Sequence, residues 1–231
     1  MPAALAGWKV LRPDLRGHAG GRSAAPAGMR EWCDDLARLL DGERCEHAVL
    51  AGHCLGANIA AQFAARHPER AAGAVLIEPM PPEALIGSLS YVKPFKPILL
   101  AVGKTALYLN RIGVKRKKLQ PMDLEAWDRR LEAGEIPLGQ FASPLSDLKS
   151  TPIAGYFLSA AAGFEPLPQR LGCPVLGMIS RKSTMTDPAR TRAAIERLGN
   201  AQIVELDAEH WIPTEQPAAM RAAMEGWLAR L

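Results

Sequence analysis

The stretch VLAGHCLGANIA at residues 49–60 constrains the fold more than any other part of the sequence. An apolar run leads into Gly52, a cysteine follows at position 54, and Gly56 comes before a run of small, helix-forming residues. A glycine–x–nucleophile–x–glycine turn between a strand and a helix holds its central side chain on a strained bend above the sheet edge. A Cβ on either flanking residue is expected to collide there, so the two glycines supply the room. The pattern predicts a strand–turn–helix unit that presents the Cys54 thiol.

The residues around this turn suit nucleophilic chemistry. A helix that begins near Leu55 directs the positive end of its dipole at the sulfur, which favours the thiolate. The backbone N–H of Leu55 is then placed to donate to an oxyanion that develops during acyl transfer. The alternative is that Cys54 is an inert buried thiol and the glycines only mark a tight turn.

Alternation of short apolar runs with amphipathic helical patterns continues along the chain and predicts an α/β fold. Continuous apolar strands with helices between them indicate a mostly parallel sheet that is flanked by helices and covered on both faces. The strands are expected at 8–17, 47–52, 72–79, 173–180 and 201–208, and the helices at 28–41, 55–70, 188–198 and 214–231.

The segment 80–170 differs from the rest because it is helical where it has a pattern and is interrupted by prolines. We interpret 1–79 and 171–231 as the core and 80–170 as a helical lid inserted between two core strands, above the strand ends where α/β folds bind ligands. Part of it, 92–118, mixes aliphatic and basic residues and includes VKRKK. This part is interpreted as an acyl-binding surface with a basic rim for a coenzyme A or carrier-protein thioester, as a peripheral membrane contact, or as a solvated helix face.

Composition excludes several classes of protein. The 231 residues carry a formal net charge of +4, too diffuse to indicate a nucleic-acid partner. The four cysteines are far apart, with no CxxC pair and no metal-ligand spacing, so we expect reduced thiols in a cytoplasmic protein, no metal and no cofactor. The N-terminus lacks the pattern of a signal peptide, and no apolar run is long enough for an integral membrane segment.

Three motifs together resemble the α/β-hydrolase fold superfamily, in the family's order and spacing. They are RPDLRGHAGGRS at 12–23, GHCLGA at 52–57 and AEHWIPTEQP at 208–217. The resemblance implies an α/β-hydrolase fold with a nucleophile at Cys54 and a general base at His210. Most members have serine at the elbow. The cysteine is similar to that of dienelactone hydrolases, polyhydroxyalkanoate synthases and some thioesterases.

The acid of the triad departs from the usual pattern. The family commonly takes an aspartate from the loop after the strand that corresponds to 173–180, and that position here holds Lys182 or Ser183. Glu78 ends the apolar strand 72–79 and needs a partner, since an unpaired buried charge is costly. We therefore expect Glu78 to be the acid. Asp187, which precedes a proline and resembles a helix N-cap, is the alternative, and a site without an acid is the third possibility.

The front of the chain is short by comparison with the family, whose first three strands and HG loop precede the PDLRG motif. Only about a dozen residues precede that motif here. Either the strand at 8–17 pairs directly with the strand at 47–52, or the sheet has a gap, or the natural protein starts further upstream. Direct pairing is the least costly of the first two, because a gap leaves backbone groups unpaired.

Taken together, these features predict a hydrolase of a carboxylic ester or thioester that works through an acyl-cysteine. Cys54 attacks the carbonyl, His210 moves the proton, Glu78 orients His210, and the N–H of Leu55 stabilises the oxyanion. An acyltransferase that uses the same acyl-enzyme is the near alternative. A binding protein for hydrophobic ligands, with little or no catalysis, is the alternative from another class.

Overall fold

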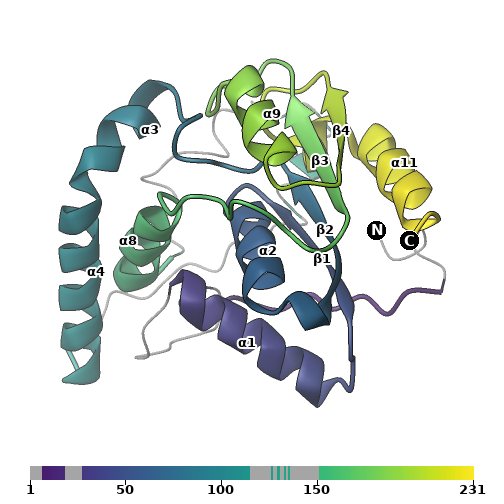
Figure 1. The fold of residues 1–231 in the computed structure, drawn as a ribbon. Coiled ribbons are helices and arrows are strands. Elements are labelled where there is room, and N and C mark those ends of the chain that lie inside the picture. The colour runs from purple at the N-terminus through teal and green to yellow at the C-terminus, as the bar shows by residue number, and fades with distance from the viewer. Residues whose placement is uncertain are drawn as a thin grey trace. The chain divides into compact units, whose positions relative to one another are not determined.

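The computed structural model describes residues 7–18, 28–114, 126, 129, 130, 133, 135 and 151–231 (Figure 1). The chain forms two compact units. The first comprises the described residues of Met1–Pro13, Met29–Lys96 and Ala162–Leu231, and the second those of Asp14–Gly28 and Pro97–Ala161. The predicted boundaries of the core and the lid stay a prediction. Within the predicted lid, Lys115–Lys118 of the basic run lie outside the described residues.

The first unit is built on a four-stranded sheet in the order β1-β2-β3-β4, and neighbouring strands are parallel throughout. The strands are β1 (Ala48–His53), β2 (Ala71–Ile77), β3 (Val175–Ser180) and β4 (Ala201–Leu206). Each lies within a residue or two of a strand expected from the apolar runs. The prediction of a parallel sheet in an α/β fold is therefore confirmed.

Helices connect and cover these strands. In the first unit they are α1 (Met29–Gly42), α2 (Leu55–Arg66), η2 (Pro68–Arg70), α3 (Gly87–Val92), η3 (Lys93–Phe95), α9 (Pro188–Glu196), α10 (Ile212–Glu215) and α11 (Pro217–Leu228). The second unit holds α8 (Ile153–Ala162), of which only the last residue belongs to the first unit, and all but the first residue of α4 (Lys96–Arg111). Among the helices of the described residues, none is both long and apolar enough to cross a membrane.

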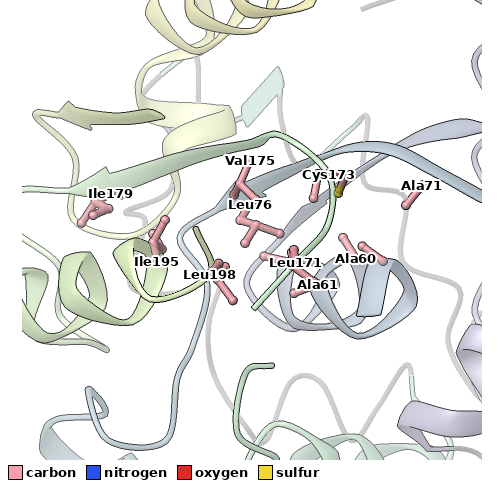
Figure 2. Close-up of a cluster of buried hydrophobic side chains, with 13 residues drawn as sticks. Ala60, Ala61, Ala71, Leu76, Leu171, Cys173, Val175, Ile179, Ile195 and Leu198 are labelled. Carbon is pink, nitrogen blue, oxygen red and sulfur yellow. The ribbon is translucent and has the colours of Figure 1, made fainter. Parts of the chain in front are cut away.

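Successive residues of the central strands point to opposite faces of the sheet, as strand geometry requires. Ala74 and Leu76 of β2 belong to a buried cluster with residues of α2 and α9, part of which is drawn in Figure 2. Val75 and Ile77, from the same strand, belong to a second cluster with residues of α10 and α11. Because both faces are buried, the strand reads as a continuous apolar run rather than an alternating one.

The expectation of a strand at 8–17 is wrong, because the described residues of this segment form no strand and no ladder with β1. The apolar side chains that suggested a strand are mostly in solvent: Trp8 is 45% exposed and Val10 51%. Leu11 packs against the cluster formed by α1 and α2, and Lys9 pairs with Glu43 at 2.6 Å. Side-chain contacts therefore help to hold the segment, and it does not pair directly with β1.

The second unit has close backbone contacts of its own. A Cβ on Gly155, in α8, would lie 2.2 Å from the carbonyl oxygen of Gly17. The hydroxyl of Ser159, on the same helix, lies 3.2 Å from Nε2 of His18. The predicted RGH loop is thereby held against α8 by a small residue and a hydrogen bond. The last part of its motif, 19–23, lies outside the described residues.

Candidate active site

The side chains proposed for catalysis follow three strands of the parallel sheet. Cys54 comes directly after β1, Glu78 directly after β2, and His210 lies in the loop after β4. The carboxyl ends of parallel strands meet at one edge of a sheet, which is where open α/β sheets bind their ligands. This topology brings residues that are far apart in the sequence to a common edge.

The turn that carries Cys54 is tight and strained. Cys54 has φ 56° and ψ −120°, an unfavourable conformation for a residue with a side chain. A Cβ on Gly52 would lie 2.1 Å from the carbonyl oxygen of Gly56, so only glycine fits at position 52. The expectation for Gly56 is wrong, because a Cβ there would meet no atom within 4 Å among the described residues. Gly56 contributes its backbone to this close approach, and the missing side chain is not needed for space.

The backbone on either side of Cys54 is anchored. Its N–H donates to the carbonyl of Ile77, which extends the ladder between β1 and β2 by one bond. Its carbonyl accepts from the N–H groups of Ala57 and Asn58 in the first turn of α2. Leu55 is the first residue of α2, and the first N–H groups of a helix have no acceptor within the helix. The Leu55 N–H is therefore directed toward the end of the helix at which the thiol sits.

Glu78 is fully buried and held by donors from the neighbouring strand and loop. The Ser180 N–H donates to its Oε2 at 2.6 Å, and the Thr186 hydroxyl donates to its Oε1 at 3.1 Å. Its Oε1 also lies 3.7 Å from Nδ1 of His210. Burial raises the pKa of Glu78, but His210, Ser183 and the Ser180 N–H outweigh it, so the pKa lies below its ordinary value.

His210 is also buried, with 1% of its surface exposed. Burial lowers its pKa, but Cys54 and Glu78 outweigh this effect and raise the pKa to about 9. Neither ring nitrogen has a hydrogen-bond partner among the described residues, and the separation from Glu78 is that of an ion pair. His210 is thus positioned between an anionic group and the thiol without being locked to either one.

Two further groups fix the loop of His210. Nε2 of His53 lies 2.9 Å from the carbonyl oxygen of His210, which can only accept, so that nitrogen carries the proton. Burial lowers the pKa of His53 to about 4, which keeps its ring neutral. The carboxylate of Glu215 accepts from the backbone N–H groups of Glu209, His210 and Trp211 at 2.8, 3.2 and 2.7 Å. Both contacts act on the loop backbone and leave the imidazole of His210 free to exchange protons.

The loop after β3, where the family commonly keeps its acid, has another role here. Lys182 points to solvent and pairs with Asp207 at 2.8 Å. Asp187 caps α9 by accepting from the N–H of Arg190, so this alternative acid is occupied elsewhere. Thr186, in the same loop, is buried, and its hydroxyl donates to Glu78. The loop therefore supports a carboxylate that comes from the preceding strand.

Sequence reasoning missed two residues that contact the turn carrying Cys54. The Sδ of Met80 lies 2.9 Å from the Sγ of Cys54, and Asn58 makes two hydrogen bonds to the backbone of Met80. The signal for Asn58 was a single amide one helical turn after Cys54 in an otherwise apolar run. Met80 gave no signal, since a methionine among prolines has no chemical pattern of its own. Within the described part of the chain, no group of three His, Cys, Asp or Glu residues could hold a metal ion.

Comparison with known proteins identifies a family for the chain. A model of the alpha/beta hydrolase family matches residues 1–223. The lipase LipV of Mycobacterium tuberculosis is 27% identical over 229 residues, which cover 95% of this chain and 83% of the lipase.

Solved structures agree on the fold. A hydrolase from Pseudomonas aeruginosa PA01 superposes with a TM-score of 0.68 at 22% identity, over 98% of this chain and 82% of that one. A thermophilic esterase from Thermogutta terrifontis superposes with a TM-score of 0.65 at 24% identity, over 94% of this chain and 78% of the esterase. With a parallel sheet, a left-handed residue at the elbow and a family match over nearly its whole length, the chain belongs to the alpha/beta hydrolase family.

Proposed function

We propose that this hydrolase cleaves carboxylic esters or thioesters through an acyl-cysteine intermediate on Cys54. The observation that carries the proposal is the buried pair of Glu78 and His210, 3.7 Å apart, at the sheet edge where the elbow presents the thiol. A buried carboxylate beside a buried imidazole costs stability, and such buried titratable pairs are concentrated at functional sites. Here the ring nitrogens of His210 lack hydrogen bonds, which favours a chemical role.

The first half-reaction forms the acyl-enzyme. With Nδ1 of His210 facing Glu78, Nε2 is the nitrogen left to hold the thiol proton of Cys54, and the raised pKa of His210 favours this imidazolium beside a thiolate. The sulfur forms a bond to the carbonyl carbon, and the oxyanion that results accepts from the N–H of Leu55. As the intermediate collapses, the bond to the leaving oxygen or sulfur breaks, and His210 returns the proton to that atom.

The second half-reaction uses water. His210, again neutral, takes a proton from a water molecule as its oxygen attacks the acyl carbon. The carbon–sulfur bond then breaks, the carboxylic acid leaves, and His210 returns the proton to Cys54. Glu78 stabilises the imidazolium during both steps, and its bonds to Ser180 and Thr186 keep it in place. In this scheme Glu78 orients and stabilises the base, without taking a proton itself.

Some of the similar proteins support ester chemistry. One is named a lipase and one neighbouring structure an esterase, both of which act on carboxylic esters. The thiol nucleophile extends the proposal to thioesters, because a thiolate exchanges readily with an acyl thioester through the same tetrahedral intermediate. The coenzyme A or carrier-protein thioester expected from the basic segment remains part of this proposal.

Turnover and covalent labelling test the assignment together. The purified protein is incubated with p-nitrophenyl butyrate and with butyryl-coenzyme A, and product release and intact mass are followed. We expect turnover and, after rapid acid quench, a butyryl adduct on Cys54. Cys54→Ala should abolish both, and Glu78→Gln should lower kcat by at least about tenfold with little change in KM, because it removes an imidazolium-stabilising charge.

Cys45→Ala is the matched control, because Cys45 is a partly exposed thiol outside the proposed site. It should keep full turnover. Full activity in Glu78→Gln would refute the assigned acid, and a protein that gives neither turnover nor an adduct would be a ligand-binding member of the family. Transfer of the butyryl group to added alcohol in preference to water would identify the acyltransferase alternative.

A further inference from the structure

The contact between Cys54 and Met80 gives the elbow a feature that the proposed mechanism does not use. The two sulfur atoms are 2.9 Å apart, with the thiol as donor and the thioether as acceptor. The thiol proton therefore has an acceptor other than His210, whose ring nitrogens have no hydrogen-bond partner among the described residues. A thiol held in this way directs its proton to Met80, while its sulfur stays near enough to His210 to raise the pKa of that ring.

The backbone of Met80 is fixed by Asn58. The Met80 N–H donates to Oδ1 of Asn58, and Nδ2 of Asn58 donates to the Met80 carbonyl, each at 2.9 Å. Asn58 is 1% exposed, so both bonds are shielded from water. Asn58 lies one turn after Cys54 on α2, and its own N–H donates to the Cys54 carbonyl. One side chain thus ties the position of Met80 to the turn that carries the nucleophile.

The sequence around Met80 makes this connection rigid. Residues 79–82 read PMPP, so Met80 provides their one backbone N–H, and Asn58 takes it. Proline also fixes φ, which leaves little backbone freedom on either side of Met80. The methionine side chain, in contrast, is unbranched and has three rotatable bonds. Movement at this point is therefore confined to rotation of the thioether.

We propose that Asn58 and Met80 form a latch that holds the Cys54 thiol in a resting orientation off His210. The inference rests on the proposed function, in which Cys54 must pass its proton to His210. An acyl group that reaches the sulfur takes the place of the thioether, which swings aside while its backbone stays clamped by Asn58. Met80 and Asn58 are positioning residues in this scheme, and the latch couples activation of the thiol to the arrival of an apolar substrate group.

The rate of Cys54 alkylation tests the latch without a substrate. The protein is treated with iodoacetamide between pH 5.5 and 8.5, and each cysteine is followed by peptide mass. Met80→Leu keeps the side-chain volume and removes the acceptor sulfur. We expect Cys54 to react about two- to fivefold faster in this variant, because a weak hydrogen bond is lost, and its pH profile to move to lower pH as the thiol pairs with His210.

The other cysteines provide internal references. Cys45 is partly exposed, and Cys33 is buried, so a loosened fold would expose Cys33 and speed its alkylation as well. Asn58→Ala should reproduce the gain at Cys54. Gln62→Ala is its matched control, since Gln62 also lies on α2 and donates to a proline carbonyl, that of Pro166, at a distance from the thiol. It should leave the Cys54 rate unchanged.

The outcomes separate the latch from the proposed function. An unchanged Cys54 rate and pH profile in Met80→Leu would overturn the latch, as would a gain accompanied by alkylation of Cys33. A gain in Met80→Leu without one in Asn58→Ala would overturn the role of Asn58. If Cys54 responds as expected but the wild-type protein turns over no ester, the latch stands and the proposed function fails.

Discussion

The pKa of His210 makes a testable prediction about stability as a function of pH. The folded state raises this pKa from 6.5 to about 9, because Cys54 and Glu78 outweigh burial. A raised folded-state pKa stabilises the protein fully below the unfolded pKa, and this stabilisation is lost as pH rises through the folded pKa. The unfolding free energy should therefore fall between pH 6.5 and pH 9.

The size of the effect follows from the shift. A difference of about 2.5 pKa units corresponds to about 3 kcal/mol, of which about 2 kcal/mol is lost between pH 6.5 and 8.5. Two other groups act outside this window. The pKa of His53 is lowered to about 4 in the folded state, so this residue reduces stability only as pH falls below the pKa that it has in the unfolded chain. Cys33, with a pKa raised by burial to about 11, adds a loss mainly above pH 9.

Urea titrations at intervals of half a pH unit measure this change, with the slope of each titration checked for constancy. His210→Gln, which does not titrate, is the matched control, and it should lose most of the decline between pH 6.5 and 8.5. A wild-type protein with constant stability in this window would refute the charged pairing of His210. The same decline in His210→Gln would assign it to another group.

Three further substitutions probe the packing of the site. Gly52→Ala should lower the unfolding free energy by about 3 kcal/mol or more, because its Cβ would lie 2.1 Å from a backbone oxygen, whereas Gly56→Ala should leave it unchanged or raise it by up to about 1 kcal/mol. Equal destabilisation of the two variants in urea would contradict the close approach at position 52. Thr186→Val removes the hydroxyl that donates to Glu78 and should cost about 1–2 kcal/mol, with a rise in the pKa of Glu78. Both effects are measurable by urea titration below and above pH 5. If the unfolding free energy of Thr186→Val depends on acidic pH as that of the wild-type protein does, the Thr186 hydroxyl does not set the pKa of Glu78.

Much of the fold was accessible from sequence because its signals are local. The apolar run that became β2 and the small residues of α2 each specify an element by composition alone, and the parallel arrangement follows from their alternation. The segment at 8–17 failed for a non-local reason. Its apolar residues, Trp8 and Val10, suit a strand, but a strand forms only where a neighbour supplies the ladder, and no such partner for 8–17 lies among the described residues.

The candidate site was likewise predictable from sequence only where its signals are local. Cys54 and Glu78 could be placed at the sheet edge because each ends an apolar strand, and their backbone positions depend only on that strand. The partners of those side chains come from other loops, so Thr186 and Met80 could not be found without knowing how the loops pack. Gly52 and Gly56 show the limit within a single motif. Two glycines with the same apparent role differ because only one of them faces backbone atoms.

The left-handed backbone at Cys54 costs stability at the same position where the proposed chemistry requires a cysteine side chain. Glycine or asparagine would accept φ 56° at lower cost than cysteine does. A selection for thermal resistance alone should therefore drift toward Gly or Asn at position 54, whereas a selection for turnover should hold the thiol. Libraries sorted by these two criteria would diverge first at this residue.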